Sequence, residues 1–211
     1  AHLRGTRFHG WRTPATLVEH CRRLVTSGEP LVFAYYDGID KVAHEYGLRD
    51  EFFQAELGAA DRLVEALLES LPPSAALVVT SDHGQVHFDA QISLAPIAKL
   101  VGAYAGDGRF RFLYAERGAA GALLEEATDR FGSVAWVMGR DQVVDERWLG
   151  PAPPSTTVAR RLGDVVLAAR GPIAFIDPTH PVEAGLRAGH GSLTPAEMFV
   201  PLLAGRGSGA G

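Results

Sequence analysis

The chain has only one cysteine, Cys21, among its 211 residues. One thiol cannot form an intrachain disulfide, and it cannot by itself supply a zinc site made of thiolates. Such sparing use of cysteine favours a reducing compartment. The cytoplasm is therefore the favoured location on this argument, which leaves the compartment otherwise open.

The chain also lacks long apolar runs and an excess of positive charge. Its longest apolar runs, such as 31–36 and 165–169, have the length of strands, so we expect no membrane segment or signal peptide. Lysine and arginine number 20 against 25 aspartates and glutamates, and the net charge is −5. This balance argues against binding to nucleic acids or to anionic membranes, because that binding depends on clustered positive charge.

The chain does contain enough apolar sequence for a substantial core, since 46% of its residues are hydrophobic. Helical periodicity and short apolar runs alternate along it. The expected helices are 14–27, 48–71, 119–131 and a short one that follows a capping box at 194–197. The expected strands are 31–36, 76–80, 109–115, 133–138, 164–169, 172–176 and 200–203. This alternation predicts an α/β fold with a doubly wound, mostly parallel sheet.

The middle of the chain has a different pattern, strand, helix and strand, between a glycine-rich stretch and a proline-rich stretch. We therefore expect a small α+β insert or cap at 105–154. The α/β core would be formed by 1–104 and 155–205, and 206–211 would be a flexible tail.

Five side chains that can bind divalent cations follow predicted strands. Asp40 and His44 lie four residues apart, so one helical turn places both on the same side. Asp82 and His83 directly follow strand 76–80, and His190 stands between two glycines. Residues beyond the carboxyl ends of strands meet at one edge of an α/β sheet. Two aspartates and three histidines exceed the needs of one catalytic zinc and suit two adjacent metals.

Each motif also has a simpler interpretation. Asp40 and His44 are compatible with a polar surface loop, and Asp82 with a turn that caps the strand and leaves His83 exposed. His190 alone is compatible with a flexible loop histidine. The combination, rather than any one motif, indicates a metal-dependent hydrolase.

The motifs occur in a fixed order and are followed by GHGSLTPAEMFVPL at 189–202. With this arrangement the chain resembles, over nearly its whole length, the nucleotide pyrophosphatase/phosphodiesterase branch of the alkaline phosphatase superfamily. The resemblance implies that Asp40, His44 and His190 bind one metal ion, that Asp82 and His83 bind the other, and that both are zinc. It also implies in-line attack on phosphorus by a threonine or serine alkoxide, which gives a phosphoenzyme that water hydrolyses.

The resemblance implies that the family's nucleophile and a further metal-binding aspartate belong to an N-terminal portion outside the chain. We therefore expect the C-terminal portion of an alkaline-phosphatase-like fold, with no nucleophile in the chain and little turnover by the chain alone. The expected partners are a small phosphate-ester or nucleotide substrate and the missing N-terminal portion of the same protein.

The parent enzyme is expected to cleave phosphodiester or pyrophosphate bonds in nucleotide-like substrates. Two alternatives stay open at this point. One is another activity of the alkaline phosphatase superfamily, a phosphatase or a sulfatase-like esterase. The other is a non-catalytic interaction module in which the metal only stabilises the fold.

Overall fold

The computed structural model describes residues 4–209. The contacts within the chain divide it into two compact units. The described residues of the first unit are 4–42, 51–81 and 201–209, and those of the second are 43–50 and 82–200. Helix α2 (Gly38–Tyr46) contributes residues to both units.

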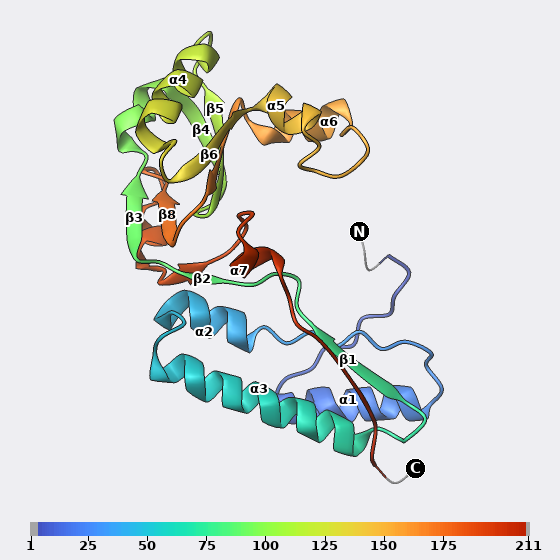
Figure 1. The fold of residues 1–211 in the computed structure, drawn as a ribbon. Helices are drawn as coiled ribbons and strands as arrows, with labels where there is room; N and C mark the ends of the chain where they lie inside the picture. The colour runs from blue at the N-terminus through green and yellow to red at the C-terminus, as the bar shows by residue number, and fades with distance from the viewer. Residues whose placement is uncertain (1–3, 210–211) are drawn as a thin grey trace. The chain divides into compact units, whose positions relative to one another are not determined.

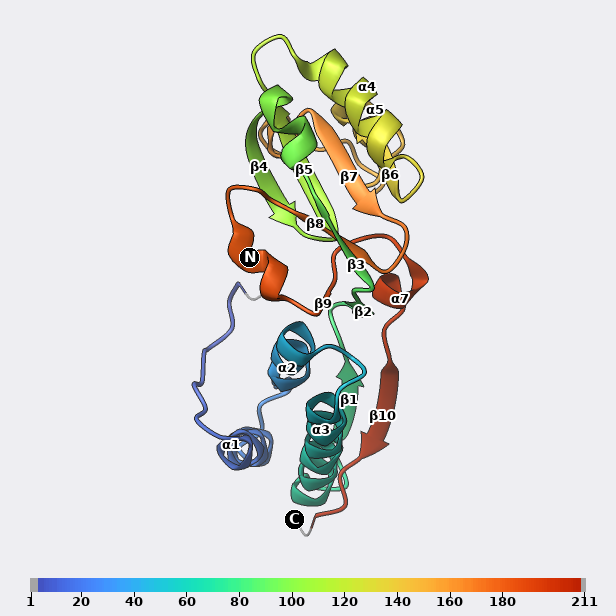
Figure 2. The same cartoon turned by 90° about the vertical axis from the view of Figure 1, so that its left-hand side faces the viewer.

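The first unit packs two helices against a pair of strands. Its elements are α1 (Pro14–Thr26), α3 (Glu51–Ser70), β1 (Ala76–Thr80) and β10 (Leu202–Arg206). Strands β1 and β10 pair antiparallel, and both lie along α3 (Figure 1, Figure 2). Burial of one face of each helix forms the core, whose buried members are Leu17, Cys21, Leu63 and Leu67.

The end of this unit differs from the flexible tail expected at 206–211. The Gly207 amide donates to the Ala75 carbonyl at 3.1 Å, and the Ser208 amide donates to the Leu68 carbonyl at 2.8 Å. The expected tail therefore begins as an ordered continuation of β10 against α3. Residues 210 and 211 lie outside the described part of the chain.

The strand predicted at 31–36 is wrong for the described residues. This segment has no regular hydrogen-bonded structure there, and the side chains of Leu31 and Phe33 are 84% and 65% exposed. A run of apolar residues is typical of a buried strand, but a strand forms only where a second strand pairs with it through backbone hydrogen bonds.

The second unit is built on a four-stranded antiparallel sheet. Its strands, in order across the sheet, are β4 (Val101–Asp107), β5 (Phe110–Ala115), β7 (Val165–Ala169) and β6 (Ala135–Gly139). Its helices are α4 (Ala120–Phe131), α5 (Arg140–Asp145), α6 (Thr156–Ala159), α7 (Pro195–Met198) and the 3-10 helices η1 (Ala95–Leu100), η2 (Arg160–Leu162) and η3 (Pro181–Gly185). Helix α4 covers one face of the sheet (Figure 2), while α5 and η2 pack on the other. All five residues of β7 are buried because both faces are covered.

Two further strand pairs complete this unit. Strand β2 (Val86–His87) pairs antiparallel with β9 (Ala188–Gly189), and β3 (Ala90–Ser93) pairs parallel with β8 (Ile173–Ile176). The β3–β8 pair is thus the parallel one among the described residues, where a mostly parallel sheet was expected. Apolar periodicity locates strands but carries no information on the direction in which they pair.

The residues expected to form a separate insert, 105–154, are also arranged differently. They supply β5 and β6, and both of these strands pair with β7, which lies outside the expected range. The glycine-rich and proline-rich stretches are loops, but strands on either side of a loop can join one sheet because strand pairing is non-local. Within residues 4–209 no helix is long and apolar enough to cross a membrane.

Candidate metal centre

A short antiparallel ladder joins the segments that carry His83 and His190. Val86 of β2 stands opposite Gly189 of β9, and His87 stands opposite Ala188. His83 precedes β2 and His190 follows β9, so the antiparallel pairing brings these two ends of the ladder together. The two imidazole rings stack with their centroids 3.5 Å apart and their planes 11° from parallel.

His44 joins this pair from the last turn of α2. Its Nδ1 lies 2.8 Å from the Ala188 carbonyl oxygen, and its own carbonyl accepts from the Arg187 amide at 2.8 Å. A carbonyl oxygen only accepts, so Nδ1 carries the hydrogen and Nε2 carries the lone pair that a metal would use. The rings of His44 and His190 have centroids 5.3 Å apart. The fold therefore gathers three histidines from three separate segments.

His83 and Asp82 offer a second set of ligand atoms next to each other. His83 Nδ1 lies 3.1 Å from the Gly84 carbonyl oxygen, which again assigns the hydrogen to Nδ1 and the lone pair to Nε2. That Nε2 is 3.6 Å from Asp82 Oδ1. Two ligands of one tetrahedral zinc with bonds of about 2.0–2.1 Å lie about 3.4 Å apart. The spacing of these two atoms therefore suits one shared ion.

Asp40 lies in the first turn of α2 and is partly buried. It belongs to the first unit, whereas His44 belongs to the second. Because both residues are on one helix and four positions apart, α2 presents them on the same side. The helix ends at Gly47, whose φ of +83° is a left-handed conformation that favours glycine.

His87 supports this arrangement, a role that its position in the sequence did not reveal. The Leu48 amide, just after α2, donates to His87 Nδ1 at 3.2 Å. An ion pair between Arg49 and Asp89, with N and O 3.0 Å apart, lies nearby on the same two segments. His87 therefore connects the end of α2 to β2 through a hydrogen bond. A contact between residues so far apart in the chain cannot be predicted from local sequence patterns.

Glu197 and Arg109 are the other residues that sequence reasoning missed. Thr194 and Glu197 were expected to form a capping box, but the Thr194 side chain makes no hydrogen bond to the backbone of α7, and its hydroxyl donates to the Glu197 carboxylate. Glu197 also forms a buried ion pair with Arg109. Burial by itself raises the pKa of Glu197, but hydrogen bonds from Arg109, Thr194 and the Ser192 amide hold it below its usual value.

Glycine at Gly84 is required by close packing and not by a left-handed backbone conformation. Its φ is not positive. A Cβ at Gly84 would lie 2.1 Å from the Ala196 carbonyl oxygen, so glycine is needed for the close approach of α7 to the His83 loop.

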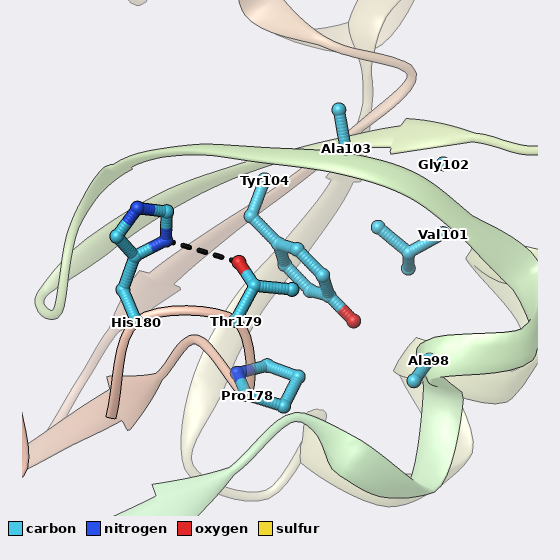
Figure 3. Close-up of a pocket in the computed structure, with 8 residues that line it drawn as sticks. All are labelled: Ala98, Val101, Gly102, Ala103, Tyr104, Pro178, Thr179 and His180. Carbon is cyan, nitrogen blue, oxygen red and sulfur yellow. Dashed lines mark hydrogen bonds between the residues drawn. The ribbon is translucent and has the colours of Figure 1, made fainter.

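A separate pocket of about 380 Å³ lies between β4 and the loop after β8 (Figure 3). Its lining includes Tyr104, Thr179 and His180 but none of the five predicted ligands. His180 Nδ1 is 3.0 Å from the Thr179 hydroxyl and 3.3 Å from Asp177 Oδ2. This histidine is thus held by its neighbours in the sequence.

The donor set fits a borderline divalent cation such as zinc. Imidazole and carboxylate are among the ligands that zinc takes in proteins. Two of the three histidines donate Nδ1–H to a backbone carbonyl, which is the orientation that metal-binding histidines need. The residue types and the orientation of His44 and His83 therefore fit a divalent cation of the kind that the resemblance implies.

Comparisons with known proteins give a matching family and similar folds. The sequence profile of the family described as type I phosphodiesterase / nucleotide pyrophosphatase matches residues 12–192. A comparison with curated proteins gives no significant match. Among solved structures, murine ectonucleotide pyrophosphatase/phosphodiesterase 5 is similar with a TM-score of 0.75 and 18% identity, over 97% of this chain and 56% of that one. The human counterpart has a TM-score of 0.64 and 19% identity, over 94% of this chain and 54% of that one.

A bacterial enzyme has a similar fold. Phosphonoacetate hydrolase from Sinorhizobium meliloti, in complex with phosphonoformate, has a TM-score of 0.62 and 19% identity, over 92% of this chain and 51% of that one. The chain thus spans about half the length of the solved structures it matches. The expected α/β class and the partial alkaline-phosphatase-like fold are confirmed. The chain belongs to the type I phosphodiesterase / nucleotide pyrophosphatase family.

Proposed function

We propose that the chain is the C-terminal portion of a two-metal hydrolase that cleaves phosphodiester or pyrophosphate bonds. Asp40, His44 and His190 hold one divalent ion, and Asp82 and His83 hold the other. Zinc is the ion best suited to this mixture of imidazole and carboxylate ligands. The observation that carries the proposal is the meeting of three histidines from three segments, two of them oriented through Nδ1–H bonds to the backbone.

The residues of the chain have separate tasks in this mechanism. His44 and His83 each form a hydrogen bond from Nδ1 to a backbone carbonyl. This bond fixes the ring orientation and the tautomer, so that Nε2 of each ring is available to a metal ion. Asp82 is 71% exposed, so a substrate phosphate can approach the atoms beside it from solvent. When bound, a pair of zinc ions stabilises the entering and leaving oxygens of an in-line displacement.

The nucleophile is proposed to lie outside the chain. Ser192 follows His190 closely, but its hydroxyl donates to the Ala169 carbonyl at 2.6 Å and the residue is 2% exposed, so it serves the fold. The chain spans about half the length of its structural relatives, and the apolar side chains of Leu31, Phe33 and Leu202 are exposed. Apolar surface of this kind supports a further portion of the same protein that covers the first unit.

The substrate class is proposed from the family, and a nucleotide-like phosphodiester is its first member. Phosphonoacetate hydrolase is structurally similar to a comparable degree, so another hydrolysis reaction of the superfamily is the second candidate. Members of one fold differ in the groups that hold the non-transferred part of the substrate, and fold alone does not choose between them.

The first test is the zinc content of the purified 211-residue chain, measured by elemental analysis. We expect about one tightly held ion per chain, because three protein ligands make a stable site and two make an open one. Asp40→Ala should remove this ion, whereas Asp82→Ala should retain it. His180→Ala is the matched control and should bind as much zinc as the unaltered chain, since His180 is bonded to Asp177 and Thr179 instead.

The second test is hydrolysis by the longer protein that contains this chain. Bis(p-nitrophenyl) phosphate, p-nitrophenyl phosphate and phosphonoacetate distinguish a diesterase, a monoesterase and a phosphonate hydrolase. A preference for the diester supports the proposal, and a preference for either of the others selects another superfamily activity. Zinc binding without hydrolysis of any of the three would instead indicate a non-catalytic metal-binding module.

A further inference from the structure

A buried ion pair between Arg109 and Glu197 contacts the loop that carries His190. Arg109 and Glu197 have side chains that are 0% and 1% exposed, and two hydrogen bonds of 2.9 and 2.7 Å join the guanidinium to the two carboxylate oxygens. Arg109 Nη1 donates to the carbonyls of Gly171 and Ile173. These contacts fix the guanidinium to the connection between β7 and β8 and to the start of β8 itself.

The Glu197 carboxylate, fixed by Arg109, also binds the His190 loop through hydrogen bonds. Its Oε1 accepts from the Ser192 amide at 3.0 Å as well as from Arg109, and its Oε2 accepts from the Thr194 hydroxyl. Each carboxylate oxygen therefore has one donor from Arg109 and one from the loop. Ser192 is only two residues after His190, so the loop cannot shift without breaking these bonds.

The backbone of Glu197 holds the other loop of the candidate metal centre. Its carbonyl oxygen accepts from the Gly84 amide at 2.8 Å. Gly84 directly follows His83, and a Cβ there would collide with the Ala196 carbonyl, so the two segments are in tight contact. One residue thus contacts both the segment that carries His83 and the segment that carries His190.

We propose that Glu197, anchored by Arg109, is a positioning residue that holds His83 and His190 at the spacing that metal binding requires. This inference rests on the proposed function of the site. Glu197 acts through hydrogen bonds to Ser192, Thr194 and Gly84 and does not itself bind the metal. A mismatch of a few tenths of an ångström in ligand position weakens a metal site, so rigid support of two ligand loops has a direct effect on affinity.

The main test compares two buried arginines in the 211-residue chain, with zinc as the probe. Arg109→Met removes the anchor of Glu197. Arg111→Met is the matched control, because Arg111 is 1% exposed and donates to Phe175 and Glu183, not to either ligand loop. Zinc affinity is measured by competition with a chelating dye at a temperature where each variant is folded, and the unfolding midpoint is measured with chelator present.

We expect Arg109→Met to weaken zinc binding by about 10- to 100-fold, the range seen when an outer-shell partner of a metal ligand is lost. Arg111→Met should lower the unfolding midpoint but leave zinc affinity within about twofold of the unaltered chain, because no ligand loop depends on it. Equal effects of both variants on zinc affinity would reduce Arg109 to a general structural role and overturn the inference.

A milder pair of variants keeps the test decisive if Arg109→Met does not fold. Thr194→Val removes one loop bond to Glu197 and leaves the ion pair intact, while Thr194→Ser keeps the hydroxyl. Weaker zinc binding by Thr194→Val, restored in Thr194→Ser, supports the inference. If the unaltered chain binds zinc and Thr194→Val binds it equally well, the inference fails and the proposed function stands. If the unaltered chain binds no zinc, the proposed function itself fails.

Discussion

Replacement of Gly84 by alanine tests the close contact on which the His83 loop depends. The added Cβ would lie 2.1 Å from the Ala196 carbonyl oxygen and 3.1 Å from its carbonyl carbon. Both are backbone atoms of the segment that forms α7, so no side-chain rotation can relieve the clash. Either the His83 loop or α7 must move.

The size of the effect follows from this geometry. A separation of 3.0 Å, below which real Cβ contacts essentially never occur, requires a displacement of 0.9 Å from the 2.1 Å separation. Overpacking of this kind costs about 1–3 kcal/mol, and the hydrogen bond from the Gly84 amide to Glu197 contributes about 0.5–1.5 kcal/mol. We therefore expect Gly84→Ala to lower the free energy of unfolding by about 1.5–4.5 kcal/mol. Zinc affinity should fall as well, because ligand distances tolerate deviations of only about 0.2 Å.

The assay is urea unfolding followed by circular dichroism, with zinc affinity measured on the folded protein. Gly121→Ala provides the matched control, since Gly121 lies within α4 and a Cβ there meets nothing within 4 Å. That variant should be neutral or more stable by up to about 1 kcal/mol, as expected for glycine replaced in a helix. Unchanged stability and zinc affinity in Gly84→Ala would refute the reasoning that α7 and the His83 loop are locked together.

Three further outcomes are expected. The pKa of Glu197 is lowered in the folded state, so this carboxylate stabilises the fold at pH values above its unfolded pKa of about 4.3. The contribution is lost as the pH falls through the folded pKa. With chelator present, the difference in unfolding free energy between the unaltered chain and Glu197→Gln should therefore shrink as the pH falls from 6. A hydrogen bond to Glu56, together with burial, raises the pKa of Tyr36 to about 12, and ultraviolet titration of Glu56→Gln should return it toward 10. Leu167→Ala in the buried centre of β7 should cost about 2–5 kcal/mol in urea unfolding, and a loss below 1 kcal/mol would contradict the packing of that strand between two covered faces.

Local sequence patterns predicted several elements closely. The strand expected at 76–80 is β1 (Ala76–Thr80), and the helix expected at 119–131 is α4 (Ala120–Phe131). In these segments the apolar periodicity agrees with the surface that the element buries, so local and tertiary preferences point the same way. The pattern failed at 31–36, where apolar residues indicate a strand but the described residues provide no pairing partner.

The identity of the candidate ligands was accessible from sequence because it depends on residue type and on local spacing. Aspartates and histidines placed directly after predicted strands, together with the segment around His190, were sufficient to indicate a metal site and the family. Periodicity and composition also established the α/β class, because they depend on residues close together in the chain.

Only the tertiary structure decided how these residues are held. The stacking of His83 on His190, the bond from His44 to Ala188 and the buried pair of Arg109 with Glu197 join residues far apart in the chain. A one-dimensional pattern cannot specify such contacts, because they depend on strand direction, register and side-chain packing, which are settled only when separate segments fold together.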